Sequence, residues 1–100
     1  LRVHDLKSGK IYWLTDGARA RDPDITRDGK WIVFTEASDG SVDLAMARLT
    51  TRGGELRLEG KRKIVDAAPG DRIANPKFSP DQKSIVFAWK KEGQLSEGLY

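Results

Sequence analysis

Several residue types and patterns that identify common protein classes are missing from this sequence of 100 residues. There is no cysteine, which excludes disulfide bonds and thiolate metal sites. No long segment repeats apolar residues with the spacing of an amphipathic helix. No run approaches the ~20 consecutive apolar residues that a membrane-spanning helix needs. We therefore expect a fold without disulfides, with little or no helix and with no membrane span.

The sequence has no large excess of charge of either sign. The 18 lysine and arginine residues are balanced by 15 aspartate and glutamate residues, which leaves a formal net charge of +3. The densest basic run, residues 61–63, is too short for a nucleic-acid-binding arm, and no aromatic residues are interleaved with it. Nucleic acid is therefore not an expected partner. The 38% of apolar residues is sufficient for one folded core.

Both ends of the sequence look like the ends of a fragment. The chain opens on Leu1 rather than methionine, without the basic start and apolar run of a signal peptide. It stops at Gly98-Leu99-Tyr100, which reads as a strand that is only beginning. We expect a fragment, or a processed piece, of a longer protein.

Short β-rich runs separated by turn residues occupy most of the chain. They predict a hairpin made of residues 1–6 and 10–15. Further strands are expected at residues 21–26, 30–36, 42–49, 55–67, 73–79 and 83–89, with the start of another at the end of the chain. Four consecutive apolar residues, from Trp31 to Phe34, indicate a strand covered on both faces. Pro23 suits an edge strand. The segment 55–67 is expected to be a long or bulged strand, with Gly60 as its break.

One segment of the sequence returns later in the chain. "DPDITRDGKWIVFTE" at residues 22–36 and "NPKFSPDQKSIVFAW" at residues 75–89 share Pro, Asp, Lys, Ile, Val and Phe in register, 53 positions apart. Leu44 aligns best with Leu99, which indicates a longer loop in the second copy. Four-stranded units that repeat at this size are typical of a β-propeller.

The sequence therefore predicts an all-β fold made of β-propeller blades of four antiparallel strands each. Residues 1–15 are expected to be the last two strands of one blade. Residues 16–67 would form a complete blade, and residues 68–100 the first part of the next blade.

Both copies of the segment resemble the TolB-like propeller repeat, which contains Ser-Pro-Asp-Gly-Lys followed by an Ile-x-Phe strand. Residues 1–17 are similar to the last hairpin of a blade in that family and carry the familiar Leu14-Thr15. The resemblance covers nearly the whole chain. It implies a parent propeller of six blades that serves as an interaction platform, often in the bacterial periplasm.

Two departures from that signature concern the turn, in which Asp caps the chain and Gly accepts a positive φ. Thr26-Arg27 replaces Ser-Pro in the first copy, and Gln82 replaces Gly in the second. Because a left-handed glutamine costs about 1 kcal/mol, either the second turn changes type or neighbouring residues compensate. The Ile-x-Phe side chains are expected to be buried against the next blade.

Catalytic and metal-binding patterns are hard to find. The motifs Gly-x-Ser-x-Gly and His-Glu-x-x-His are absent, and so are the phosphate-binding loops. The single histidine, His4, is interpreted as a plain strand residue. Asp22, Asp24 and Asp28 precede a glycine, but residues 26–27 occupy positions where a calcium loop needs a ligand and a glycine. We interpret the three aspartates as turn caps and expect no catalytic residue, no metal and no cofactor.

The three tryptophans, Trp13, Trp31 and Trp89, lie on predicted strands with apolar neighbours. We interpret them as core and inter-blade packing rather than as an aromatic binding platform.

The loops between strands remain as candidate recognition sites. In a propeller, the loops at residues 16–21, 37–42, 67–72 and 90–98 would lie together around the channel mouth. They carry a predominantly basic set: Arg19, Arg21, Arg72, Lys90, Lys91, Asp39 and Asp71. Such a rim favours an anionic partner, and ordinary solvated surface charge is the alternative. We predict that Arg19, Arg21 and Arg72 contact the partner.

These observations predict a non-catalytic propeller scaffold that binds a protein or a peptide. One alternative is the gating or substrate-selecting propeller of a prolyl-oligopeptidase-like or tricorn-like peptidase, whose catalytic domain would lie outside this chain. Another is a propeller lyase that acts on acidic sugars. Such a lyase uses rim histidines and a metal, which His4 alone cannot supply.

Two blade-equivalents cannot close a propeller, because apolar faces and strand edges would stay open. The strand order allows the last strands of one copy to be completed by the first hairpin of another copy. Three copies would then form a homo-trimer with six blades. The other explanation is that the remaining blades belong to a longer chain.

Overall fold

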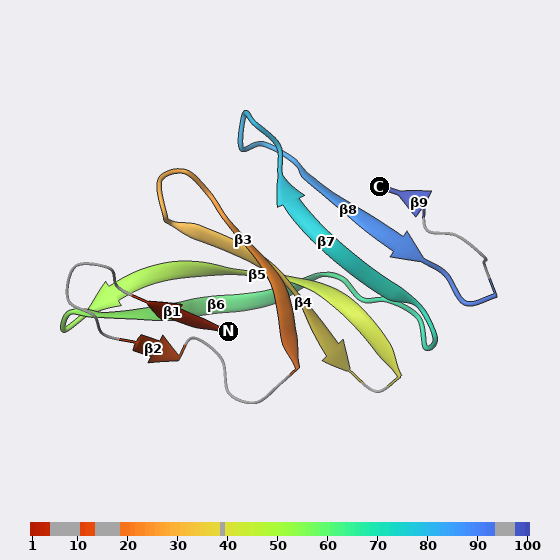
Figure 1. The fold of residues 1–100 in the computed structure, drawn as a ribbon, viewed down its shortest axis with the longest axis horizontal. Helices are drawn as coiled ribbons and strands as arrows, with labels where there is room; N and C mark the ends of the chain where they lie inside the picture. The colour runs from red at the N-terminus through yellow and green to blue at the C-terminus, as the bar shows by residue number, and fades with distance from the viewer. Residues whose placement is uncertain (5–10, 14–18, 39, 94–97) are drawn as a thin grey trace.

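The computed structural model describes residues 1–4, 11–13, 19–38, 40–93 and 98–100, with the backbone alone for residues 3–4 and 11–13. All regular structure within these residues is β-strand, so the predicted all-β class is confirmed. No helix in the described part of the chain is long and apolar enough to cross a membrane. Figure 1 shows the strands, which are β1 (Arg2–His4), β2 (Ile11–Trp13), β3 (Ala20–Ile25), β4 (Trp31–Ser38), β5 (Ser41–Arg52), β6 (Glu55–Val65), β7 (Arg72–Phe78), β8 (Ile85–Lys90) and β9 (Gly98–Leu99).

Strands β3 to β6 form one antiparallel meander, in which each strand pairs with the next along the chain. β4 pairs with β5 from Trp31 to Ser38, along its whole length. β3 lies at the edge of the sheet, where the missing N–H of Pro23 leaves no gap in a ladder. The loop predicted at residues 37–42 is shorter than expected, because residues 37–38 continue β4 and β5 begins at Ser41.

Gly60 produces a bulge rather than a break in β6. The strand continues from Glu55 to Val65, and its register with β5 shifts between Met46 and Arg48. Gly60 has a φ of 62°, a backbone conformation that glycine adopts without strain. The long or bulged strand predicted for this segment is therefore a single strand, and its register with β5 shifts a second time between Leu44 and Ala45.

The second copy of the repeated segment folds in the same way as the first. The four Cα pairs of the β3–β4 ladder all recur between β7 and β8 with 53 added to each residue number, and both ladders shift register at the same place. Asp22 and Asn75 lie within these shifts and share a φ of 52°. We refer to residues 20–65 as the first repeat and to residues 72–99 as the second repeat.

The two tight turns that follow β3 and β7 are also built alike. In the first turn, the Thr26 hydroxyl donates a hydrogen bond of 2.6 Å to Asp28, which also accepts the Lys30 N–H at 2.9 Å. In the second turn, Asp81 likewise accepts hydrogen bonds from the Ser79 hydroxyl at 2.5 Å and from the Lys83 N–H at 3.0 Å. These hydrogen bonds lower the pKa of Asp28 and of Asp81, and the side-chain hydroxyl contributes most in both cases.

Gln82 occupies the left-handed position of the second turn, where the first turn has Gly29. Its φ is 63°, close to the 72° of Gly29, so the type of turn is unchanged. The Gln82 amide nitrogen donates to the Ser79 carbonyl at 2.8 Å, and the amide oxygen accepts the Arg27 N–H at 2.9 Å. Neighbouring residues therefore compensate the strain, and one of them belongs to the first repeat.

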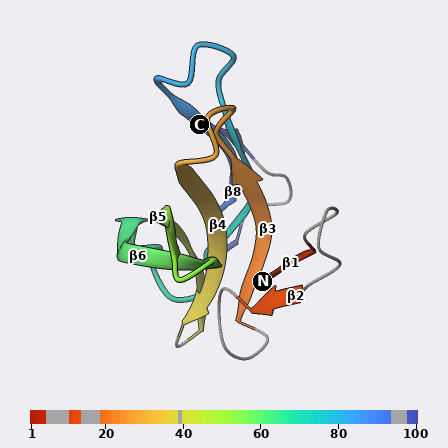
Figure 2. The same ribbon diagram turned by 90° about the vertical axis from the view of Figure 1, so that its left-hand side faces the viewer.

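The two repeats meet in a short parallel contact that the sequence did not predict. Val42 at the start of β5 pairs with Arg72 at the start of β7. The sheet is consequently mixed, with the order β3-β4-β5-β7-β8-β9 and with β6 paired to β5. β1 and β2 pair antiparallel in a separate two-stranded sheet, as the predicted hairpin requires. Figure 2 shows β8 behind β4, so that the repeats are layered.

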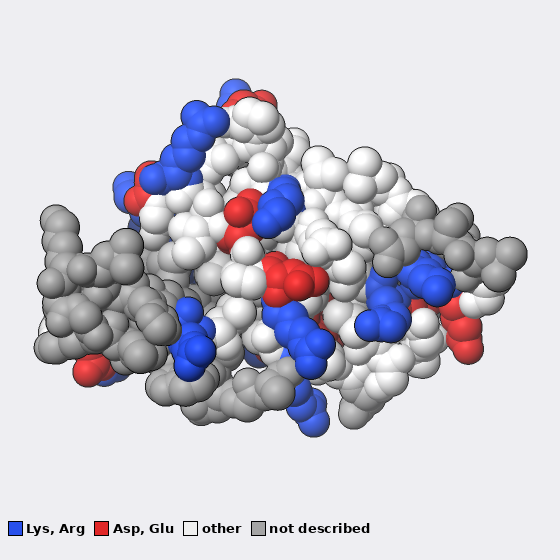
Figure 3. Space-filling view, viewed as in Figure 1, with Lys and Arg blue, Asp and Glu red and all other residues white. Residues whose placement is uncertain are grey.

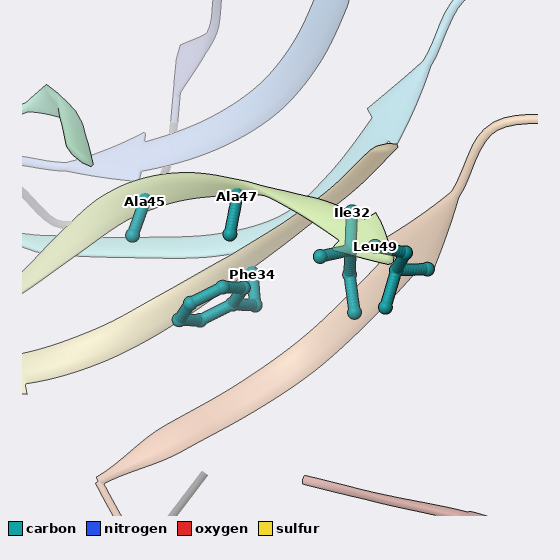
Figure 4. Close-up of a cluster of buried hydrophobic side chains, with 5 residues drawn as sticks. All are labelled: Ile32, Phe34, Ala45, Ala47 and Leu49. Atoms are coloured by element: carbon teal, nitrogen blue, oxygen red, sulfur yellow. The ribbon is translucent and has the colours of Figure 1, made fainter. Parts of the chain in front are cut away.

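One face of the first repeat carries a compact apolar cluster on β4 and β5 (Figure 4). Its buried members are Ile32, Phe34, Ala45, Ala47 and Leu49. The partly buried side chains of Leu1, Ala20 and Leu58 pack against this cluster. The core on this face is thus covered in part by the residue that directly precedes β1.

The opposite face of the first repeat packs against the second repeat. Val33 and Leu44 are fully buried there, and the partly buried Ile85 and Phe87 contact their cluster. The Ile-x-Phe side chains of the second repeat are therefore partly buried, and they pack against the preceding repeat rather than against a following blade as expected. Successive side chains of a strand point to opposite faces, so the two faces of β4 serve two different neighbours.

Two aspartates connect the repeats by hydrogen bonds instead of capping turns. The Asp22 carboxylate accepts the Asn75 N–H at 3.3 Å, and the Asp24 carboxylate accepts the Phe78 N–H at 2.7 Å. The interpretation of the acidic residues as turn caps is correct for Asp28 and wrong for these two. The layering of the repeats brings the N–H groups of β7 to β3, which local sequence patterns do not reveal.

We expect Phe34→Ala to lower the free energy of unfolding by about 3–5 kcal/mol, because truncation of a fully buried phenylalanine leaves a cavity. The equivalent Phe87→Ala should cost less, since that ring is only half-buried. Urea denaturation followed by tryptophan fluorescence measures both losses. Equal losses would contradict the difference in burial.

Asp28 and Asp81 should stabilise the fold less as the solution is acidified. Their pKa values lie below the ordinary 3.8 in the folded protein. Their stabilisation is therefore complete above that value and is lost as the pH falls through the lower folded pKa. The double variant Asp28→Asn, Asp81→Asn should flatten the pH dependence of the urea midpoint below about pH 4. Asp66→Asn is the control, and an unchanged slope in the double variant would overturn this role.

Candidate functional site

A cleft of about 470 Å³ lies where the two repeats meet. Its lining includes four basic side chains, which belong to Arg19, Arg21, Arg72 and Lys90, and the carboxylate of Asp22. The buried Thr35 and Ile73 also line it. The structure thus brings together all three arginines that the sequence predicted to contact a partner.

Backbone hydrogen bonds hold these arginines in place. Arg19 directly precedes β3, and its carbonyl accepts the Ala37 N–H at 2.9 Å. Arg21 lies within β3, and its carbonyl accepts the Thr35 hydroxyl at 3.2 Å. Arg72 opens β7 at the contact with β5. Arg21 and Arg72 are therefore strand residues and not loop residues as predicted, so their backbones are held by sheet pairing.

Arg19 and Arg72 occupy equivalent positions, because 53 residues separate them as they separate the two copies of the repeated segment. An arginine therefore lies just before the first strand of the first repeat and at the first residue of the second repeat, and both line the same cleft. Lys90 is in turn equivalent to Ala37, which lines the same cleft. The sequence contained the signal for this arrangement, since extending the alignment by three residues toward the N-terminus pairs the two arginines.

The basic side chains of the cleft lack acidic partners within the described part of the molecule. No ion pair there involves Arg19, Arg21, Arg72 or Lys90, and all four residues are exposed. The one lining carboxylate, Asp22, instead accepts a backbone N–H of the second repeat. Figure 3 shows basic side chains on this face near the start of β3 and near the end of β8. The cleft therefore carries an excess of positive charge.

Asp71, a member of the predicted rim, has a structural role. Only 7% of its surface is exposed, and its carboxylate accepts hydrogen bonds from Trp89 Nε1 at 3.2 Å and from the Glu92 N–H at 2.8 Å. Lys91 lies over the rings of Trp89 and Tyr100, at 4.8 and 5.4 Å from their centroids. Asp39, the other acidic rim residue, lies outside the described residues. Neither Asp71 nor Lys91 lines the cleft.

Asp43 fixes the strand that forms the opposite wall of the cleft. Its fully buried carboxylate accepts the Ser41 hydroxyl at 3.1 Å and the Ala67 N–H at 2.9 Å. The Lys63 ammonium lies 3.1 Å from the other carboxylate oxygen, and this ion pair with Asp43 raises the pKa of Lys63. These contacts hold the start of β5, and with it Val42, against the segment that leads to β7.

The other candidates from the sequence whose side chains are described, Trp31 and Trp89, do not line this cleft. The side chains of His4 and Trp13 lie outside the described residues. Trp31 is half-buried beneath the Arg48 guanidinium, 5.6 Å from its ring centroid, whereas Trp89 packs against the core as interpreted. Where the structure describes side chains, no three His, Asp or Glu residues gather into a cluster that could hold a metal ion.

Comparison of the chain with family models, with curated proteins and with solved structures finds no match.

Proposed function

We propose that this chain is part of a β-propeller of the TolB-like kind and acts as a non-catalytic scaffold that binds a protein or a peptide. The turn that recurs as Asp28-Gly29-Lys30 and Asp81-Gln82-Lys83, each followed by an Ile-x-Phe strand, supports this proposal. So does the meander β3–β6, which has the four strands typical of a propeller blade. We further propose a periplasmic or other extracytoplasmic bacterial location, which depends on the resemblance alone.

The unpaired positive charge of the cleft is the observation that carries the binding function. Guanidinium groups recognise carboxylates with two parallel hydrogen bonds, so Arg19, Arg21 and Arg72 suit an acidic segment of a partner. A cleft of about 470 Å³ has the size of a site for a small ligand or a few side chains. The partner would therefore insert a short acidic stretch rather than dock a flat surface.

Substitution of the three arginines tests this function. Because clustered charge attracts an opposite charge over a distance, the variant Arg19→Ala, Arg21→Ala, Arg72→Ala should slow association of a glutamate-rich peptide roughly 10-fold or more at low salt. Its association rate should also depend less on salt than that of the unaltered chain. Stopped-flow fluorescence with a labelled peptide measures both effects.

The matched control removes the same charge elsewhere, with Arg27→Ala, Arg57→Ala and Arg62→Ala. These side chains are exposed and do not line the cleft. If both triple variants slow association equally, the effect comes from net charge alone. If the cleft variant associates as fast as the unaltered chain, the proposed site is contradicted.

The described residues should not turn over a substrate on their own. A nucleophile and a base within hydrogen-bond reach are needed for hydrolysis, and the chain has a single histidine. We expect no hydrolase, lyase or phosphatase activity above background with chromogenic ester, phosphate, peptide and uronide substrates. Activity that persists on purification and disappears with His4→Ala would contradict the non-catalytic function.

A further inference from the structure

Two cationic residues lie directly opposite each other at one end of the β7–β8 ladder. Arg72, the first residue of β7, pairs with Lys90, the last residue of β8, and Figure 1 shows these two strand ends side by side. Residues that are directly opposite in an antiparallel pair share one face of the sheet, with Cβ atoms about 4.5–5.5 Å apart. Both residues line the cleft between the repeats, so two positive charges are held close together in its wall.

The first repeat shows that the fold does not need a second cation at this position. Arg19 is the counterpart of Arg72, and the residue 53 positions before Lys90 is Ala37. The Ala37 N–H donates to the Arg19 carbonyl at 2.9 Å, so alanine is accepted opposite an arginine here. Like charges directly opposite each other destabilise a sheet modestly. Lys90 therefore adds repulsion at a position that the first repeat fills with a neutral side chain.

Neighbouring carboxylates do not neutralise this pair within the described part of the molecule. Asp71 directly precedes Arg72, but its carboxylate accepts hydrogen bonds from Trp89 Nε1 and from the Glu92 N–H. Neither Asp71 nor Glu92 lines the cleft, and no ion pair among the described residues involves Arg72 or Lys90. The hydrogen-bond donors of the pair are therefore available to an anion from outside the chain.

The other lining residues limit what kind of anion fits. Arg19 and Arg21 add two guanidinium groups from the first repeat, and Asp22 adds one carboxylate. No aromatic side chain is among the described residues that line the cleft, so a nucleotide base would have no ring to stack on. The apolar part of the lining is aliphatic and consists of Ala37, Val42, Ile73 and Ala74. Four cations against one carboxylate suit a doubly charged group on a small aliphatic carrier.

We propose that the Arg72–Lys90 pair binds a phosphate monoester carried on the acidic segment that enters the cleft. This inference rests on the proposed function and specifies its ligand. A phosphate monoester has about 1.5 to 2 negative charges at pH 7 and three acceptor oxygens. One such group can accept two hydrogen bonds from the guanidinium and a third from the ammonium. A carboxylate has one charge and two oxygens, so a bidentate bond to Arg72 would leave Lys90 without an equal partner.

Titration calorimetry of the 100-residue chain with two matched peptides tests the proposal. One peptide is glutamate-rich, and in the other its central glutamate is replaced by phosphoserine. We expect the phosphoserine peptide to bind roughly 10-fold more tightly at pH 7 and low salt. Because the second pKa of the phosphate is about 6, this preference should shrink at about pH 5.5, where glutamate side chains remain ionised.

Lys90→Ala is the central variant, because it gives the second repeat the residue that the first repeat has at this position. It should bring the affinities of the two peptides together. Its urea midpoint should be unchanged or higher, since a contact between like charges is lost. Lys90→Arg should retain the preference for phosphoserine. Lys77→Ala is the matched control, because Lys77 is exposed on β7 and does not line the cleft, and it should also retain the preference.

The two proposals fail in different ways. Equal affinities of the unaltered chain for the two peptides would overturn the phosphate site and leave the binding of an acidic segment intact. A preference that survives Lys90→Ala would overturn it as well. Displacement of the phosphoserine peptide by an equal concentration of inorganic phosphate would show a site for the free anion and contradict a phosphate carried on a segment. If neither peptide binds, the binding function itself is contradicted.

Discussion

The packing of two sheet faces between the repeats is the interaction on which the rest of this structure depends. Side chains of the second repeat pack against Val33 and Leu44 of the first repeat, which are fully buried. Complete burial of such a side chain contributes about 1.5–3 kcal/mol to the stability of the fold. This contact requires β4 to be apolar on both faces, because its other face packs towards β1. Burial on two sides makes β4 the central layer of the molecule.

Polar contacts at the rim of this apolar interface set how the repeats are aligned. Asp24 accepts the Phe78 N–H, and Gln82 accepts the Arg27 N–H. Each bond joins a residue of one repeat to the corresponding turn or strand of the other. A shift of one residue along the interface would leave the part-buried Phe78 N–H without its partner, which is costly for a donor shielded from water. The apolar contact therefore supplies the stability, and the aspartates and Gln82 specify one register.

The basic cleft follows from that register. Arg19 and Arg72 occupy the same position in two repeats, and they face one cavity because the repeats are stacked rather than extended in a plane. Repulsion among four cations is weak where the side chains are solvated and screened by salt, so the interface can hold them together. This arrangement concentrates positive charge without burying it. Such charge remains available to a carboxylate-bearing partner.

Local sequence patterns determined the strands, the turns and the repeat itself. The four apolar residues from Trp31 to Phe34 predicted a doubly covered strand, and the Asp28-Gly29 turn recurred with Gln82 in the glycine position. These features depend on alternation and on turn chemistry within a few residues, so the sequence was sufficient for them.

The tertiary structure alone decided which faces meet. Val33 and Val86 occupy equivalent positions, yet one is buried and the other is exposed. Asp22 and Asp24 look like turn residues in the sequence but bind N–H groups more than 50 positions away. The parallel contact of β5 with β7 carries no sequence signal of its own. Burial, interface hydrogen bonds and the convergence of the arginines on one cleft depend on contacts between distant segments, and local propensity contains no information about such contacts.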